Sequence, residues 1–323
     1  MTQTMAVALT GLAQIALFVF IAPAVVGFQR WIQIRLQLRK GPAPWQPYLN
    51  LIKLMGIHPG LRPVTTSWVY VIAPLVVFVC YALLGWATPP FSLGYIPLDF
   101  LAVIYLLGLA RFILALAGMD TGTSFGGMGS SREMFINVLV EPVLILIIFT
   151  LAFQRHTTNM IGIITGFSSP PSATSFVFNL AALFLLWLAL AFVTLMDNGF
   201  LPVDNPSTHL ELTMIQKALH LEYSGRNLAL IEWGEAMRLT FFLTLLGDLL
   251  IPRSVAVLSG VLAGIQAPLL YVIKLLVAAG LLALFEVTQI KLRLRRVVIP
   301  WFVALLLVIA AAFLAAGFLV GGQ

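Results

Sequence analysis

Long apolar segments separated by polar loops dominate this chain of 323 residues. A helix needs about 20 mainly apolar residues to cross a bilayer, and eight segments meet that requirement. We expect membrane-spanning helices near residues 5–28, 66–87, 97–118, 134–154, 176–196, 235–251, 266–288 and 299–320. The pattern therefore predicts an all-α, polytopic membrane protein in which residues 1–323 form a single membrane domain.

Composition supports this class of protein. The chain is 61% hydrophobic and 9% charged, with a mean hydropathy of +1.03, whereas a soluble domain carries about 25% charged residues. Most lysines and arginines fall in four of the predicted loops, at residues 29–65, 119–133, 197–234 and 289–298. The net charge of +6 therefore reflects topology in a lipid bilayer, not nucleic-acid binding. The positive-inside rule places these loops in the cytoplasm and both termini outside, in a multi-pass protein of the cell inner membrane.

Two cytoplasmic segments have the pattern of amphipathic helices lying at the membrane surface. The first follows Pro47 and extends to Leu54. The second begins with Asn205 as cap and Pro206 as first helical residue, and Gly225 is expected to end it. Leu212, Ile215 and Leu219 form its apolar stripe. Its polar stripe contains His209, Thr213, Gln216 and His220.

The fourth span carries acids along one face. Glu133, Asn137 and Glu141 are spaced i, i+4 and i+8, so the two carboxylates lie about 12 Å apart along the helix axis. Ser130 and Glu133 match a capping box, which gives Glu133 a structural explanation as well. Glu141 lies two turns inside apolar sequence, where an acid costs about 2.5–3.5 kcal/mol and by default marks an ion or proton path. A structural ion pair with Arg111 is the alternative.

A second charged group opens the sixth span, where Glu232, Glu235 and Arg238 are spaced i, i+3 and i+6. An ion pair between Glu235 and Arg238 explains them as well as a proton relay does. Acids of the preceding loop are expected to be partly solvated and together to form an acidic funnel. These are Asp197, Asp204, Glu211 and Glu222.

Several other charges lie in or near spans. Arg111 and Glu286 are near cytoplasmic ends, where their side chains can reach the interface, and Asp248 is expected to be hydrated at the outer end of its span. Lys274 lies deeper. The proton-path candidates are thus Glu133, Glu141, Asp204, Glu211, Glu222 and Glu235. The ion-pair or relay candidates are Arg111, Arg132, Arg238 and Lys274.

No motif of this chain indicates a metal or redox centre. The glycine-rich stretch from Gly122 to Gly129 has no lysine after its last glycine, as a Walker A loop requires, so we expect a tight turn or a docking surface there. The four histidines lack metal-ligand spacing, and Cys80 is the single cysteine. We therefore expect neither a cofactor nor a catalytic residue in this chain.

Three spaced motifs carry a resemblance to the complex I subunit 1 family. The first is Lys40-Gly41-Pro42 with Gln46-Pro47-Tyr48. The second is Gly129-Ser130-Ser131-Arg132-Glu133-Met134, followed by Glu141-Pro142. The third is Leu201-Pro202-Val203-Asp204-Asn205-Pro206 with His209-Leu210-Glu211-Leu212 and Leu221-Glu222-Tyr223-Ser224-Gly225.

The second and third motifs look most similar to the membrane subunit of formate hydrogenlyase and of energy-converting group 4 [NiFe] hydrogenases. The resemblance implies a membrane anchor and ion-coupling subunit that links redox chemistry in a docked arm to proton or Na⁺ translocation. It also implies partners: hydrogenase large and small subunits and an iron–sulfur subunit, which carry the [NiFe] and iron–sulfur centres, and antiporter-like membrane subunits.

Three alternative functions remain open from the sequence. One is subunit 1 of an NADH:quinone oxidoreductase with a quinone site. In the quinone-type motif an arginine stands at the place of Phe200 and acids at those of Ser207 and His209. The other two are a stand-alone secondary transporter and a passive anchor in which every buried acid is an ion pair.

Overall fold

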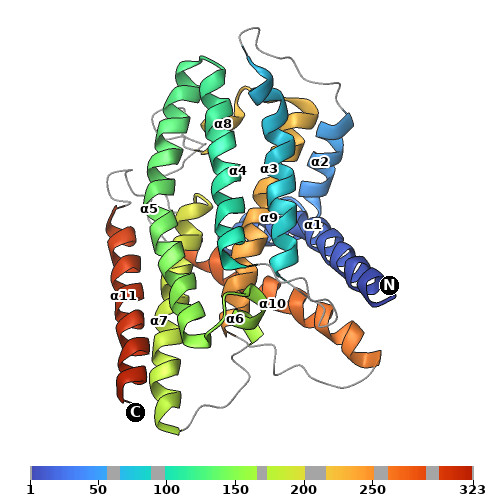
Figure 1. The fold of residues 1–323 in the computed structure, drawn as a ribbon. Helices are drawn as coiled ribbons and strands as arrows, with labels where there is room; N and C mark the ends of the chain where they lie inside the picture. Colours follow the sequence, from blue (N-terminus) through green and yellow to red (C-terminus); the bar gives the residue numbers. More distant parts are fainter. Residues whose placement is uncertain are drawn as a thin grey trace.

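The computed structural model describes residues 2–56, 66–88, 99–165, 173–200, 216–250, 261–288 and 298–321. Within these ranges the regular structure is helical, apart from an isolated β-bridge between Asp99 and Asn159 (Figure 1). The helices are α1 (Thr2–Leu36), α2 (Gln46–Gly56), α3 (Trp68–Ala87), α4 (Phe100–Asp120), α5 (Ser124–Arg155), α6 (Met160–Thr165), α7 (Ala173–Asp197), α8 (Gln216–His220), α9 (Gly225–Leu250), α10 (Val261–Thr288) and α11 (Val298–Gly321).

The predicted class, an all-α polytopic membrane protein, is confirmed. Among the described residues, seven helices are long and apolar enough to span a bilayer: α1, α3, α4, α5, α7, α10 and α11. The sixth predicted span, at 235–251, coincides with most of α9, which is helical but is not one of the seven. Three charged residues, Glu235, Arg238 and Asp248, interrupt its apolar sequence. The eight-span count therefore stays a prediction.

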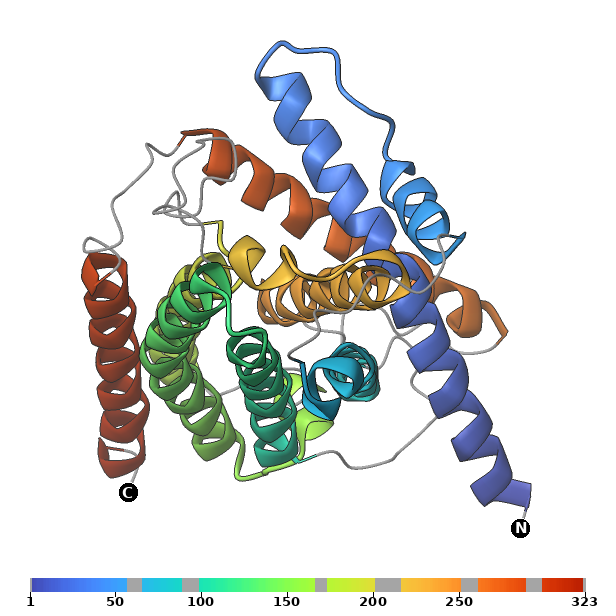
Figure 2. The ribbon, with the colours of Figure 1, turned by 90° about the horizontal axis from the view of Figure 1, so that it is seen from above.

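Helix α9 lies at the centre of the bundle. It packs against α1, α2, α3, α7 and α10, and from above it lies between α1 and α11, which occupy opposite edges (Figure 2). Seventeen of its residues, from Gly225 to Asp248, are buried. Arg238 and Asp248 are among them, so these two charged side chains face neighbouring helices and not lipid, which is the arrangement expected of ionisable residues in a membrane.

Helix α5 begins ten residues before the predicted span. Thr123 is its N-cap, because the Thr123 hydroxyl accepts a hydrogen bond from the amide of Gly126 at 3.1 Å. The predicted tight turn at 122–129 is therefore wrong beyond Gly122 (φ +66°), and so is the capping box at Ser130. The Ser130 hydroxyl donates instead to the carbonyls of Ala115 and Gly126, at 2.9 and 2.7 Å.

The two predicted surface helices have different outcomes. The first is confirmed as a helix by α2, whose Leu51 is buried while Leu49 and Ile52 are exposed. Of the second, residues 205–215 lie outside the described residues, and the rest includes α8. Its polar stripe does not face water, because Gln216 and His220 are buried. Gly225 does not end this helix but begins α9, with φ +57°.

Candidate functional site

A buried ion-pair cluster is centred on Asp197, the last residue of α7. Arg111 of α4 pairs with one carboxylate oxygen, and Nε of Arg238 from α9 lies 3.7 Å from the other. These three residues are between 2 and 4% exposed. Each charge is too costly to bury alone, so the three helices are held together by a set of charges that must balance as a group.

Gln216 of α8 connects this cluster to a second acid. Its side-chain amide nitrogen donates to the backbone carbonyl of Asp197 at 2.8 Å and to Oε1 of Glu133 at 3.4 Å. Its amide oxygen accepts a hydrogen bond from Arg238 at 3.2 Å. One uncharged side chain therefore contacts both carboxylate-bearing residues and one of the two guanidinium groups.

Glu133 supplies the second carboxylate near the two arginines. It lies on α5, is 4% exposed, and its Oε2 has no hydrogen-bond partner among the described residues. A carboxyl oxygen that is buried without such a partner is a place where a proton can be bound or released with little change in the surrounding bonds. Glu133 thus differs from Asp197, whose two carboxylate oxygens both pair with arginines.

Glu235 forms a second group one helical turn from Arg238. Its two carboxylate oxygens lie 3.1 Å from Nζ of Lys217 and 3.3 Å from Nε2 of His220. The Glu235 carboxylate raises the pKa of Lys217, so that residue is a cation. Burial lowers the pKa of His220 to about 4, so its imidazole is neutral at pH 7.

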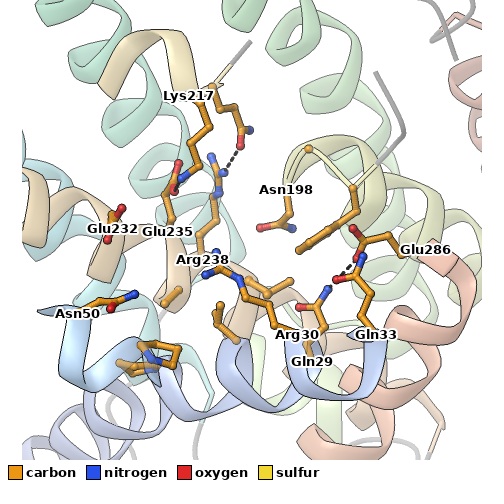
Figure 3. A pocket seen from close by; sticks show the side chains of 18 of the residues that line it. Gln29, Arg30, Gln33, Asn50, Asn198, Lys217, Glu232, Glu235, Arg238 and Glu286 are labelled. Carbon is orange, nitrogen blue, oxygen red and sulfur yellow. Dashed lines mark hydrogen bonds and ion pairs between the residues drawn. The ribbon is translucent and has the colours of Figure 1, made fainter. Parts of the chain in front are cut away.

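A cavity of about 320 Å³ borders both groups and is lined by residues of α1, α2, α8, α9, the end of α10 and the segment that follows α7. Lys217, Glu235 and Arg238 gather on one side, and Gln29, Gln33 and Glu286 on the other, with Asn198 between them (Figure 3). Nε2 of Gln29 donates to Glu286 at 3.3 Å. Polar side chains on opposite walls give this cavity hydrogen-bonding partners for water, and Glu235 and Arg238 of the two charged groups line it.

The structure brings together four of the predicted site residues: Glu133, Glu235, Arg111 and Arg238. Glu235 and Arg238 do not form the predicted pair with each other, because each has partners on other helices. Arg111 does not reach the interface, because it is buried against Asp197. The alternative reading of Glu141, as an ion-pair partner of Arg111, has no such pair behind it among the described residues, where Arg111 pairs with Asp197.

Other predicted residues lie apart from the cluster. Glu141 is half-buried, and a Cβ added at Gly108 of α4 would lie 3.6 Å from its Oε1. Glu222 and Arg132 are also half-buried. Lys274 pairs with Asp248 at 3.2 Å, and both are buried, so the predicted hydration of Asp248 is wrong. Asp204 and Glu211 lie outside the described residues.

Sequence reasoning missed four residues as members of the site: Asp197, Gln216, Lys217 and His220. Asp197 was predicted to be partly solvated but is 2% exposed. One signal could have identified it, because an arginine inside an apolar span needs a carboxylate partner and Asp197 ends another such span. The three residues of α8 gave no comparable signal. In the described part of the chain, no group of His, Cys, Asp and Glu side chains could hold a metal ion.

The fold and this site define a polytopic membrane protein with a network of buried charges around its central helix. The chain belongs to the NADH dehydrogenase family, whose model matches residues 9–316; this confirms the family resemblance inferred from the three motifs.

Relatives of this chain include components of two hydrogenases of Escherichia coli K12. The chain is 31% identical to formate hydrogenlyase subunit 4 over 85% of its own length and 87% of that protein. It is 33% identical to hydrogenase-4 component C over 75% of its length and 74% of that protein. It is 28% identical to one subunit of the NADH-quinone oxidoreductase of Rickettsia conorii over 64% of each chain.

The fold is also found in a solved archaeal respiratory complex, the membrane-bound sulfane sulfur reductase. A chain of that complex superposes with a TM-score of 0.77 over 95% of this chain and 99% of its own length, at 18% identity.

Proposed function

We propose that this chain is the membrane subunit of a complex of the formate hydrogenlyase or hydrogenase-4 type, related to complex I, and that it couples redox chemistry in a docked hydrophilic arm to ion translocation. The two hydrogenase relatives match at higher identity and over more of the chain than the quinone reductase subunit does. In this proposal the [NiFe] and iron–sulfur centres belong to partner subunits, and antiporter-like subunits lie alongside in the membrane.

The observation that carries the proposal is the position of α8. This helix of five residues contacts Glu133 and Asp197 through Gln216, and Glu235 through Lys217 and His220. It belongs to the predicted cytoplasmic loop at 197–234. A partner that binds this loop can therefore change the surroundings of three buried acids by moving one short segment.

The electrostatics of the cluster give such a movement a defined consequence. With Glu133 ionised, two arginines face two carboxylates; with Glu133 protonated, the same arginines face Asp197 alone. Displacing Gln216 from Glu133 removes a hydrogen bond that favours the ionised carboxyl, so the carboxyl gains affinity for a proton. Returning Gln216 to its place lowers that affinity again. A redox-driven cycle in the docked arm would thus load and unload Glu133.

The cavity supplies the route between this cluster and the cytoplasm. Its wall contains Glu235 and Arg238 on one side and Glu286 on the other. Water in such a space carries protons between carboxylates without requiring them to touch. We assign the cavity as the entrance and Glu133 as the first buried acid of the path.

The test is isosteric neutralisation of Glu133 in the intact complex. The complex with Glu133→Gln should assemble and retain the hydrogenase activity of its arm, but should lose ion movement into proteoliposomes. The matched control is Asp99→Asn, which removes an exposed acid and should leave both measurements unchanged. Normal ion movement by the Glu133→Gln complex would contradict the proposal.

The same experiment separates the alternatives. If variants that neutralise Glu133 and Glu235 together translocate ions normally, the buried acids serve only as ion pairs and the chain is a passive anchor. If the purified subunit alone moves ions in liposomes, it is a secondary transporter. If a quinone analogue binds the purified complex and displaces a probe from the cavity, the quinone-reductase alternative is favoured.

A further inference from the structure

Another buried ion pair joins the central helix α9 to α10, remote from the cluster around Asp197. Nζ of Lys274 on α10 is 3.2 Å from Oδ1 of Asp248 on α9, and the two side chains are 5 and 3% exposed. Gly247 faces Lys274, because a Cβ added at Gly247 would lie in ordinary van der Waals contact with Cβ of Lys274, at 3.4 Å. Replacing such a pair by apolar residues is often neutral or stabilising, so stability alone is a weak reason for its presence.

Hydroxyl groups occupy the interval between the two charged sites. Thr240, Thr244 and Asp248 are spaced i, i+4 and i+8 and so follow one face of α9. The hydroxyls of Thr240 and Thr244 donate to the carbonyls four residues earlier, at 2.8 and 2.7 Å. The Thr244 hydroxyl also lies 3.2 Å from that of Tyr271 on α10.

We call these residues the polar strip: Thr240 and Thr244 lie on one face of α9, and Thr244 meets Tyr271 where α9 packs against α10. Ten residues separate Arg238 from Asp248, which corresponds to about 15 Å along the helix. Tyr271 and Lys274 are three residues apart on α10 and hence share a face. Thr240, Thr244 and Tyr271 are all buried, so this strip lies inside the protein and not against lipid.

The far end of the strip approaches the opposite face of the bundle. Asp248 borders a small cavity of about 20 Å³ together with Met160 and Ile163 of α6, and it is the one polar residue in an otherwise apolar lining. Figure 1 shows α6 and α8 at opposite ends of the bundle. The Asp248–Lys274 pair therefore stands between the central cluster and the face on which α6 lies.

We propose that Asp248 and Lys274 form a proton-release relay, which gives this subunit its own exit path to the face opposite α8. This inference rests on the proposed function and adds the second half of the path. In the loaded pair Lys274 is an ammonium and Asp248 a carboxylate. Transfer of one proton along the Nζ–H···Oδ1 bond gives a neutral amine and a carboxylic acid.

The acid then gives that proton to water on the α6 side, and the amine takes up one proton that arrives past Thr244 and Tyr271. One proton enters and one leaves in each cycle, and the original ion pair is restored. The strip needs no other acid, because hydroxyl groups and intervening water can each accept one proton while donating another.

The decisive variant is Lys274→Arg in the intact complex. Arginine keeps the positive charge and the pairing with Asp248, but it does not deprotonate in proteins. The complex should therefore assemble and keep its redox activity, while proton release into the proteoliposome lumen, followed with a pH-sensitive dye, is lost. Lys53→Arg, which makes the same exchange at an exposed position of α2, is the matched control and should behave as the wild type.

The double variant Asp248→Asn/Lys274→Met, which leaves no unpaired charge, should also assemble and lose proton release. Normal release by either the Lys274→Arg or the double-variant complex would overturn the inference. Glu133→Gln distinguishes the two proposals. If Glu133→Gln abolishes translocation while the Lys274→Arg and double variants keep it, only the proposed Asp248–Lys274 relay is wrong. If all three variants keep translocation, the proposed function is wrong as well.

Discussion

Asp197 at the end of α7 forms an ion pair with Arg111 of α4, and the same carboxylate also pairs with Arg238 of α9 at 3.7 Å. One acid thus serves two cations that are almost completely buried. Removing the acid therefore leaves two buried cations, whereas removing one arginine leaves an ion pair.

Asp197→Asn should destabilise the protein more than Arg111→Met. The first change leaves two buried arginines with Glu133 as their remaining acid in the cluster, whereas the second leaves Asp197 paired with Arg238. Breaking a buried ion pair costs about 3–5 kcal/mol when the remaining charge has no partner. Thermal unfolding of the detergent-solubilised protein measures the difference. Equal midpoints for the two variants would contradict this account of the cluster.

Gly126→Ala should destabilise the corner between α4 and α5. A Cβ at Gly126 would collide with the backbone carbonyl oxygen of Gly118, which cannot move without shifting a helix. Overpacking of this kind costs about 1–3 kcal/mol. Gly127→Ala is the control, since a Cβ there meets no described atom within 4 Å, and alanine stabilises a helix interior by about 0.8–1.0 kcal/mol relative to glycine. Unfolding midpoints should move in opposite directions for the two variants.

His220 should make the folded protein sensitive to mild acid. Burial lowers the pKa of His220 to about 4 from its ordinary 6.5, so between these values the unfolded chain binds a proton that the folded protein does not. Stability is therefore highest above pH 6.5 and falls as the pH drops towards 4, by up to about 1.4 kcal/mol per pH unit. His220→Gln removes this contribution, so its unfolding midpoint should fall less with acid.

An exposed histidine provides the comparison. His156 ends α5 in the left-handed region with φ +51°, where asparagine is tolerated. His156→Asn should follow the wild-type pH profile of unfolding. If His220→Gln shows the same loss of stability between pH 6.5 and 4 as the wild type, the neutral buried imidazole is not the cause of that loss.

Glu141→Gln should impair ion translocation while leaving the central cluster intact. Glu141 is half-buried beside Gly108, and no hydrogen bond or ion pair joins it to another described residue. It lies about 12 Å from Glu133 along α5, and the proposed function makes it a second acid for a proton that moves along this helix. Ion movement in proteoliposomes should fall with little change in the unfolding midpoint. A large loss of stability would instead assign Glu141 a structural role.

The helices of this protein were largely predictable from sequence because each span must bury its backbone in an apolar segment of fixed minimum length. The beginnings of helices were less predictable. Thr123 and Ser130 both fit the pattern of an N-cap, and the choice between them is made by packing of α5 against α4, where Ser130 donates to Ala115.

The acids and arginines of the site were predictable one by one, because a charge inside an apolar segment needs a reason. Their partners were not. Arg238 is one turn from Glu235, yet it binds Asp197 and Gln216, which come from other helices. Local spacing favours the neighbour in sequence, and only the arrangement of α7, α8 and α9 in space decides otherwise.

A helix as short as α8 has little stability of its own, so its contacts with the neighbouring acids and bases stabilise it. In the proposed function, the position of α8 therefore couples partner binding at the surrounding loop to protonation of the buried acids. By thermodynamic linkage, a partner that binds one position of α8 more tightly changes the proton affinity of these acids. Protonation of the acids then changes the affinity of that partner by the same factor.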